Sequence, residues 1–140
     1  MNSLSIAQQA GALRSYFPDS RVTTTAAYAL TWVASVTPKP LCDTYQLRLH
    51  YVLGHRPHIF VVEPKLVLAP GWTKLKHVWS TERQELCVYY PKWHEWHPGL
   101  YLVKTVVPWA SEWLYHYEIW AGTGVWHGGG IEHDEEQGKK

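Results

Sequence analysis

The sequence has few cysteines, no long apolar run and no segment dominated by one sign of charge. Two cysteines among 140 residues are too few for the disulfide framework of a small secreted protein, so a reducing cytoplasm is the expected location. No run of about 18 apolar residues occurs, and residues 1–14 lack the apolar core of a signal peptide, so we expect no membrane association. The 13 basic residues are scattered and the net charge is +1, which argues against a nucleic-acid partner.

Aromatic residues are abundant by comparison. Nine Trp and nine Tyr supply large apolar surfaces with N–H and O–H groups that need partners, which favours half-buried positions and contact sites. With 46% apolar residues, the chain can bury one hydrophobic core without disulfide bonds. We therefore expect a single domain over residues 1–130, followed by a flexible polar tail over residues 131–140.

Hydrophobic spacing predicts a helix followed by an antiparallel meander of about four strands. Apolar residues recur with helical spacing over residues 4–17, where a proline ends the pattern. Residues 22–36 are rich in Val, Thr and Ala and are expected to form one long strand. Strict alternation indicates a half-buried strand over residues 45–53, and a further apolar run covers residues 58–62.

The second half of the chain predicts an irregular segment and then a helix. Residues 63–102 are interrupted by prolines and glycines, and a compact domain seldom keeps so long a loop-rich segment unless it has a function. Pro108 suits the first turn of the final helix, and Gly122 or Gly124 suits its end. The order of elements predicts an α+β fold with helices against one face of an antiparallel sheet. One face of the final helix is aromatic and is expected to pack in the core: Trp109, Trp113, Tyr117 and Trp120.

Cys87 lies within the irregular segment and is the candidate nucleophile. A thiol flanked by two aliphatic residues is often only a small core side chain. The polar residues 80–85 before it, and two tyrosines and a proline after it, instead predict a place at a solvent-reachable rim. Cys42 stands at the start of a regular strand, where packing is the expected role.

The surroundings of Cys87 resemble the active site of ubiquitin-conjugating enzymes. His77 precedes Cys87 by ten positions, which is the separation of the histidine in that family's His-Pro-Asn tripeptide from its active cysteine. The sequence Leu86-Cys87-Val88 is similar to the family's Ile-Cys-Leu core. Trp93 and Trp96 bracket the place of its tryptophan after the cysteine. The order of helix, meander, irregular segment and helix also resembles that UBC-like fold.

A longer likeness covers residues 105–115, 117–120 and 123–130, which resemble the stand-alone conjugating proteins of short bacterial type II CBASS anti-phage operons. This resemblance implies a cysteine, here Cys87, that accepts the C-terminal carboxyl group of a partner as a thioester. The implied partner is the cGAS/DncV-like nucleotidyltransferase of the same operon, which is passed toward an amine and thereby primed for anti-phage signalling. The resemblance implies no cofactor.

The same resemblance assigns roles around the cysteine. His77, Trp93 and Trp96 are expected to support the active site. Trp79 stands where the family has the asparagine that holds the oxyanion, and an indole offers one N–H donor for that role. Other residues are expected to line a groove for the partner: Tyr89, Tyr90, Gly128, Gly129 and Gly130.

Several other interpretations remain open. The histidine pairs His55/His58 and His94/His97 come without a cysteine pair, and a catalytic zinc needs three protein ligands, so we expect no metal. A Cys-His hydrolase would also need an orienting Asn or Asp and an oxyanion pair, for which the sequence has no local signature. The aromatic residues 93–126 could instead form a docking surface without chemistry, and the three glycines could be a flexible exit from the last helix.

Overall fold

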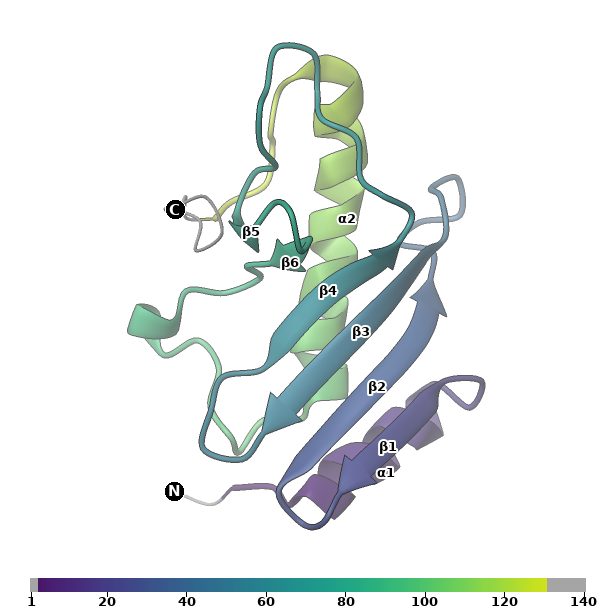
Figure 1. Ribbon diagram of the computed structural model, residues 1–140, viewed down its shortest axis with the longest axis vertical. Helices are drawn as coiled ribbons and strands as arrows, with labels where there is room; N and C mark the ends of the chain where they lie inside the picture. Colours follow the sequence, from purple (N-terminus) through teal and green to yellow (C-terminus); the bar gives the residue numbers. More distant parts are fainter. Residues whose placement is uncertain (1–2, 131–140) are drawn as a thin grey trace.

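The computed structural model describes residues 3–130 and has the α+β architecture predicted from the sequence, consistent with a UBC-like fold (Figure 1). Helices α1 (Ile6–Tyr16) and α2 (Val106–Thr123) lie on the same face of an antiparallel sheet. The sheet has six strands where about four were expected, in the order β1-β2-β3-β4-β6-β5. The predicted tail, residues 131–140, lies outside the described residues. The strands are β1 (Arg21–Thr25), β2 (Ala29–Val36), β3 (Tyr45–Val52), β4 (His58–Glu63), β5 (Val78–Ser80) and β6 (Glu85–Leu86).

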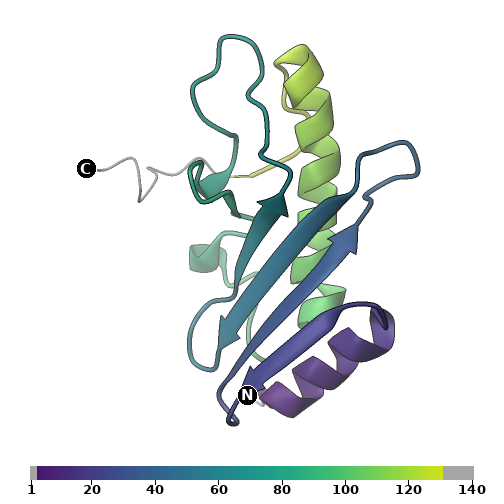
Figure 2. The ribbon, with the colours of Figure 1, turned by 45° about the vertical axis from the view of Figure 1, so that its right-hand side comes forward.

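Helix α1 begins at a reciprocal capping box. The Ser5 hydroxyl accepts from the Gln8 backbone N–H at 3.0 Å, and the Gln8 side chain accepts from the Ser5 backbone N–H at 2.8 Å. The buried Gln9 side chain donates to the Leu100 carbonyl at 3.0 Å and accepts from the Leu102 N–H at 2.9 Å. These two bonds join α1 to the chain just before α2. Helix α1 itself lies beside β1 and β2 (Figure 2).

The prediction of one long strand over residues 22–36 is wrong. The chain reverses between β1 and β2, which pair antiparallel with Val22 opposite Trp32. Ala26 takes a left-handed backbone conformation in this turn, with φ of +49°. The turn contains none of the Gly, Asn or Asp residues that usually mark such a conformation, so no local pattern announces it.

The predicted alternation over β3 is confirmed. Tyr45, Leu47, Leu49 and Tyr51 are each at most 1% exposed, because every second side chain of a strand points to the same face. This face packs against α2, where the expected core role is confirmed for Trp113, Tyr117 and Trp120, while Trp109 is half-buried. Helix α2 ends at Gly124, whose φ of +79° lets its N–H donate to the Trp120 carbonyl.

The segment expected to be irregular contains two short strands and the 3₁₀ turn η1 (Pro91–Trp93), and a second 3₁₀ turn, η2 (Leu102–Lys104), begins at its end. Strand β6 extends the sheet beyond β4, with Leu86 opposite Ile59, and β5 pairs with the outer side of β6. Cys87 is therefore the first residue after a sheet strand. None of the helices within residues 3–130 combines the length and apolar character needed to cross a membrane.

Candidate active site

The backbone of Cys87 is held by both the sheet edge and the helix. Its N–H donates to the His77 carbonyl at 3.1 Å. The same carbonyl accepts from the Trp113 indole N–H, also at 3.1 Å. His77 has φ of +53°, which turns the chain as it enters β5. One carbonyl thus fixes the cysteine relative to α2.

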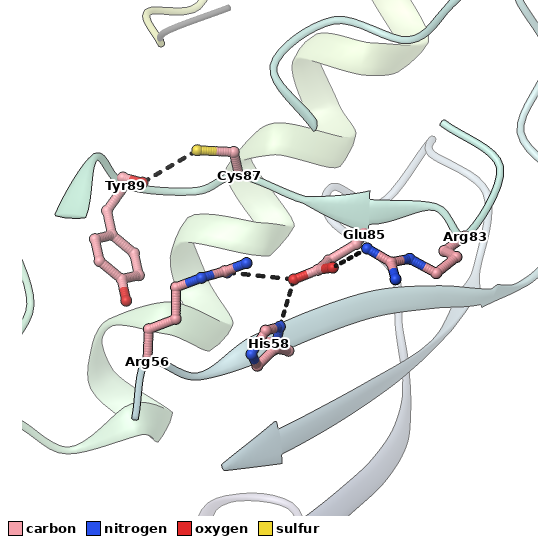
Figure 3. Close-up of polar contacts among 6 residues, drawn as sticks. All are labelled: Arg56, His58, Arg83, Glu85, Cys87 and Tyr89. Atoms are coloured by element: carbon pink, nitrogen blue, oxygen red, sulfur yellow. Dashed lines mark hydrogen bonds and ion pairs between the residues drawn. The ribbon is translucent and has the colours of Figure 1, made fainter. Parts of the chain in front are cut away.

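The Cys87 side chain is buried but faces a pocket. Its exposed fraction is 6%, which is lower than expected for the rim position predicted from the sequence. The residue lines a cavity of about 280 Å³. Its Sγ donates to the Tyr89 carbonyl at 3.1 Å (Figure 3). Burial raises the pKa of the Cys87 thiol to about 11 from an ordinary value of 9.0, and the charge of Arg56 offsets only part of that rise. The resting group at neutral pH is therefore the thiol.

Only part of the polar run before Cys87 is exposed, where an exposed rim was expected: Glu82 and Arg83 reach the solvent. Ser80, Gln84 and Glu85 are buried. Gln84 donates to the Val61 carbonyl at 2.9 Å and accepts from the Leu66 N–H at 2.6 Å. Polar side chains with such partners can be buried without leaving unsatisfied groups, which is why polarity alone mispredicted exposure here.

The pocket walls are aromatic, with acidic groups among them. Glu95 and Glu112 both line the cavity, and the Glu112 carboxylate lies 3.2 Å from His116 Nε2. The aromatic rings come from two separate parts of the chain, the segment after Cys87 and the final helix with its exit. They are Tyr89, Tyr90, Trp93, Trp109, Trp113 and Trp126.

The structure brings together most, but not all, of the residues predicted to surround Cys87. Five of the predicted residues line its pocket: Tyr89, Tyr90, Trp93, Gly129 and Gly130. His77, Trp79, Trp96 and Gly128 do not line it. Trp96 is instead 8% exposed and packs edge-on against Tyr51, with ring centroids 5.5 Å apart. Trp96 therefore lies in the hydrophobic core and not in the pocket wall.

The His77 ring packs against the segment that follows α2. It contacts the Trp126 ring at 5.1 Å between centroids. A Cβ atom added to Gly130 would lie 2.7 Å from His77 Cγ, so only glycine allows this approach. Gly128 makes a similar approach to His116, at 2.7 Å from Cδ2. The glycines thus let the segment lie close against two histidines.

A buried carboxylate lies beneath the cysteine and was not singled out from the sequence. Glu85 is 1% exposed and contacts Arg56 at 3.2 Å, His58 at 2.6 Å and Arg83 at 3.3 Å (Figure 3). Burial alone would raise the pKa of the Glu85 carboxyl, but the His58 hydrogen bond and the two guanidinium groups lower it overall. The sequence around Glu85 gives no sign of its burial. Two of its partners, His58 and Arg56, come from β4 and from the turn before β4, and only Arg83 is near Glu85 in the sequence.

Trp79 packs against a cation beside the pocket instead of lining the pocket. Its ring lies under the Arg56 guanidinium, with 4.1 Å between the guanidinium carbon and the ring centroid. Within residues 3–130, no group of three or more His, Cys, Asp or Glu side chains is arranged to hold a metal ion.

Comparison with known families gives a match over most of the chain. The family described as "Type II CBASS E2 protein" matches residues 9–134. The matched range includes the sheet, Cys87, the pocket and helix α2. No curated protein matches the chain. Because the match spans well over half of the sequence, the chain belongs to the type II CBASS E2 protein family.

Proposed function

We propose that the protein is a cysteine-dependent acyl carrier and transferase. In this proposal, Cys87 holds the C-terminal carboxyl group of a cGAS/DncV-like nucleotidyltransferase as a thioester and passes it to an amine, which primes anti-phage signalling. The observation that carries the proposal is the position of the Cys87 sulfur, which lines an aromatic pocket at the end of β6. Membership of the E2 family supports the conjugating role.

The chemistry runs in two balanced steps. The Cys87 thiol first loses its proton, and the thiolate attacks the acyl carbon of an activated C-terminus, either a mixed anhydride with a nucleotide phosphate or a thioester on a carrier. A C–S bond forms as the phosphate or the carrier thiolate leaves. An amine then attacks the thioester carbonyl, loses a proton and forms an amide, and the Cys87 thiolate is released. The thioester preserves between the steps the reactivity that a free carboxylate lacks.

The lining of the pocket supports an amine as the acceptor. Glu95 and Glu112 favour a cation, and they repel a free carboxylate. Aromatic faces such as those of Trp109 and Trp126 also attract an ammonium group. The Glu112–His116 pair lies on the same wall and offers a place for the proton that the amine must lose.

The proposal is tested by expressing the complete operon, so that any partner that activates the C-terminus is present, and by resolving the products on a non-reducing gel. We expect an adduct that collapses with hydroxylamine, which distinguishes a thioester from a disulfide. Cys87→Ala should abolish this adduct because it has no nucleophile, Cys87→Lys should give an adduct that resists thiols, and Cys42→Ser is the matched control that should leave it unchanged. If neither the wild type nor Cys87→Lys forms an adduct, acyl transfer on Cys87 is wrong.

The alternative is a non-catalytic module that binds the same partner through its aromatic surface. The burial of Cys87, with a pKa of about 11, is the observation that favours it, because a buried protonated thiol is a poor nucleophile. Cys87→Ala should retain partner binding under both hypotheses. Binding by a wild type that never forms an adduct would support the module.

A further inference from the structure

Arg56 is held from two sides beside the segment that carries the cysteine. Its guanidinium contacts a Glu85 oxygen at 3.2 Å and stacks on the Trp79 ring at 4.1 Å. Figure 3 shows the Arg56 side chain extending toward Glu85, next to the segment that carries Cys87 and Tyr89. A guanidinium has five N–H donors, more than this single carboxylate oxygen can accept, so the group has donor capacity and charge to offer elsewhere.

The two residues that hold Arg56, Glu85 and Trp79, come from β6 and β5 at the edge of the sheet. Glu85 is 1% exposed, and a carboxylate so buried needs cationic partners to remain charged. The Arg56 side chain itself is 24% exposed, so it lies between this buried anion and the surface. Pairing with Glu85 and stacking on Trp79 restrict a side chain that would otherwise have much rotamer freedom. The result is a cation of defined position.

We propose that Arg56 is the charge-stabilising residue of the site, which favours the Cys87 thiolate, and that Trp79 and Glu85 are the residues that position it. The inference rests on the proposed function, since a carrier cysteine must become a thiolate to accept an acyl group. It gives Trp79, which stands where related enzymes have an asparagine, the role of holding a cation by its ring face.

The charges around Cys87 act in opposite directions. Arg56 favours the thiolate, whereas burial and the carboxylates of Glu95 and Glu85 favour the thiol. The charge of Arg56 also lowers the pKa of Tyr89, in opposition to burial, which agrees with a cation near this whole segment. From α2, Glu112 and its partner histidine line the same pocket. Arg56 is thus the cation that counters an otherwise unfavourable setting for a thiolate.

The pH dependence of Cys87 alkylation by iodoacetamide, read by mass spectrometry in a Cys42→Ser background, tests the inference. Arg56→Gln should move the midpoint to higher pH by about one unit, a typical loss for one nearby opposite charge. At a fixed pH below the midpoint the rate should fall only about threefold, because a thiolate of higher pKa is intrinsically more nucleophilic. Arg56→Lys keeps the charge and should shift the midpoint less.

Arg83→Gln is the matched control. Arg83 contacts the other oxygen of the same carboxylate at 3.3 Å, on the opposite side of Glu85 from Arg56 (Figure 3). Its loss also removes one cationic partner of Glu85 but should leave the Cys87 midpoint unchanged. The inference is overturned if Arg56→Gln leaves the midpoint in place, or if Arg83→Gln shifts it equally.

Two further variants cover the case in which Arg56→Gln does not fold because Glu85 is left buried and unpaired. The double variant Arg56→Gln/Glu85→Gln removes both charges, and it should still raise the midpoint, since the effect of Arg56 on Cys87 exceeds that of Glu85. Trp79→Leu should raise the midpoint while Trp79→Phe, which keeps a ring face, should not. No shift in either comparison overturns the inference. Alkylation needs no partner, so a normal Arg56 dependence without any adduct on gels would overturn the proposed function alone.

Discussion

The three glycines after α2 allow a sharp test of the pocket, because an added methyl group would meet different surroundings at each. In Gly128→Ala the new Cβ would lie 2.7 Å from His116 Cδ2 and 2.9 Å from its Cγ. In Gly130→Ala it would lie 2.7 Å from His77 Cγ, on a backbone with φ of +134°. In Gly129→Ala it would meet no atom of residues 3–130 within 4 Å. Gly129→Ala is therefore an internal control for its two neighbours.

The size of each effect follows from these distances. Carbon atoms pack best at about 3.5–4.0 Å, so the His116 ring would have to move by about 1 Å. The ring resists this, because it is paired with Glu112 at 3.2 Å and contacts Trp126. Forcing extra atoms into such a contact costs about 1–3 kcal/mol. Gly130→Ala adds about 1–2 kcal/mol of backbone strain at positive φ. Gly129→Ala should change stability by less than about 0.5 kcal/mol.

Movement of the segment after α2 would relieve the strain in Gly128→Ala and Gly130→Ala and so limit the loss of stability. Residues 125–130 can move away from α2, so neither substitution can cost more than the packing of that segment. We expect the melting temperature to fall by about 3–5 °C for each kcal/mol lost, as is usual for a domain of this size. Because Gly129 and Gly130 line the pocket of Cys87, release of the segment should also speed alkylation of that thiol.

Thermal unfolding and the Cys87 alkylation rate, both in a Cys42→Ser background, check this prediction. Gly128→Ala and Gly130→Ala should be less stable and faster to alkylate, and Gly129→Ala should match the parent in both measurements. Equal behaviour of all three variants, whether harmless or damaging, would refute the described packing of the segment against His77 and His116.

Three further predictions concern buried polar groups. Stability should decline in alkali, because the Cys87 thiol has a higher pKa in the folded protein than in the unfolded chain. The unfolded chain therefore loses this proton first, and about 3 kcal/mol of stability is lost as the pH rises from 9.0 to about 11. Urea titrations at pH 9 and pH 11 should therefore show a smaller loss of unfolding free energy in Cys87→Ala than in the wild type. Equal losses would contradict the raised pKa of Cys87. Glu85→Gln should cost about 2 kcal/mol, less than a fully buried pair, because its cationic partners reach water. The pKa of Glu85 is lower in the folded protein than in the unfolded chain, so the charged carboxylate stabilises the fold above its unfolded pKa. This stabilisation is lost as the pH falls through the folded pKa, so Glu85→Gln should lose less stability than the wild type on acidification. Gln9→Leu should cost about 2–4 kcal/mol by leaving the Leu100 carbonyl and the Leu102 N–H unsatisfied, and chemical denaturation with less than 1 kcal/mol of change, roughly one ordinary hydrogen bond, would argue against both bonds.

Local periodicity made much of the fold predictable. In β3, alternate side chains must point to opposite faces, so Tyr45 and Leu47 could be placed in the core from their spacing alone. The same reasoning at helical spacing placed Trp113 and Trp120 on the buried face of α2. The turn at Ala26 was missed, because its backbone conformation carries no characteristic residue type.

The sequence by itself indicated which faces are apolar, placed the end of α2 at Gly122 or Gly124 and, through resemblance, predicted which cysteine is the nucleophile. These features depend on neighbours within a few residues. Only the tertiary structure decided that Glu85 is buried, that Arg56 lies between it and the Trp79 ring, and that Gly130 lines the pocket of Cys87. Burial of a charge depends on partners from distant strands, and a pocket depends on how separate elements pack, so neither leaves a mark in local spacing.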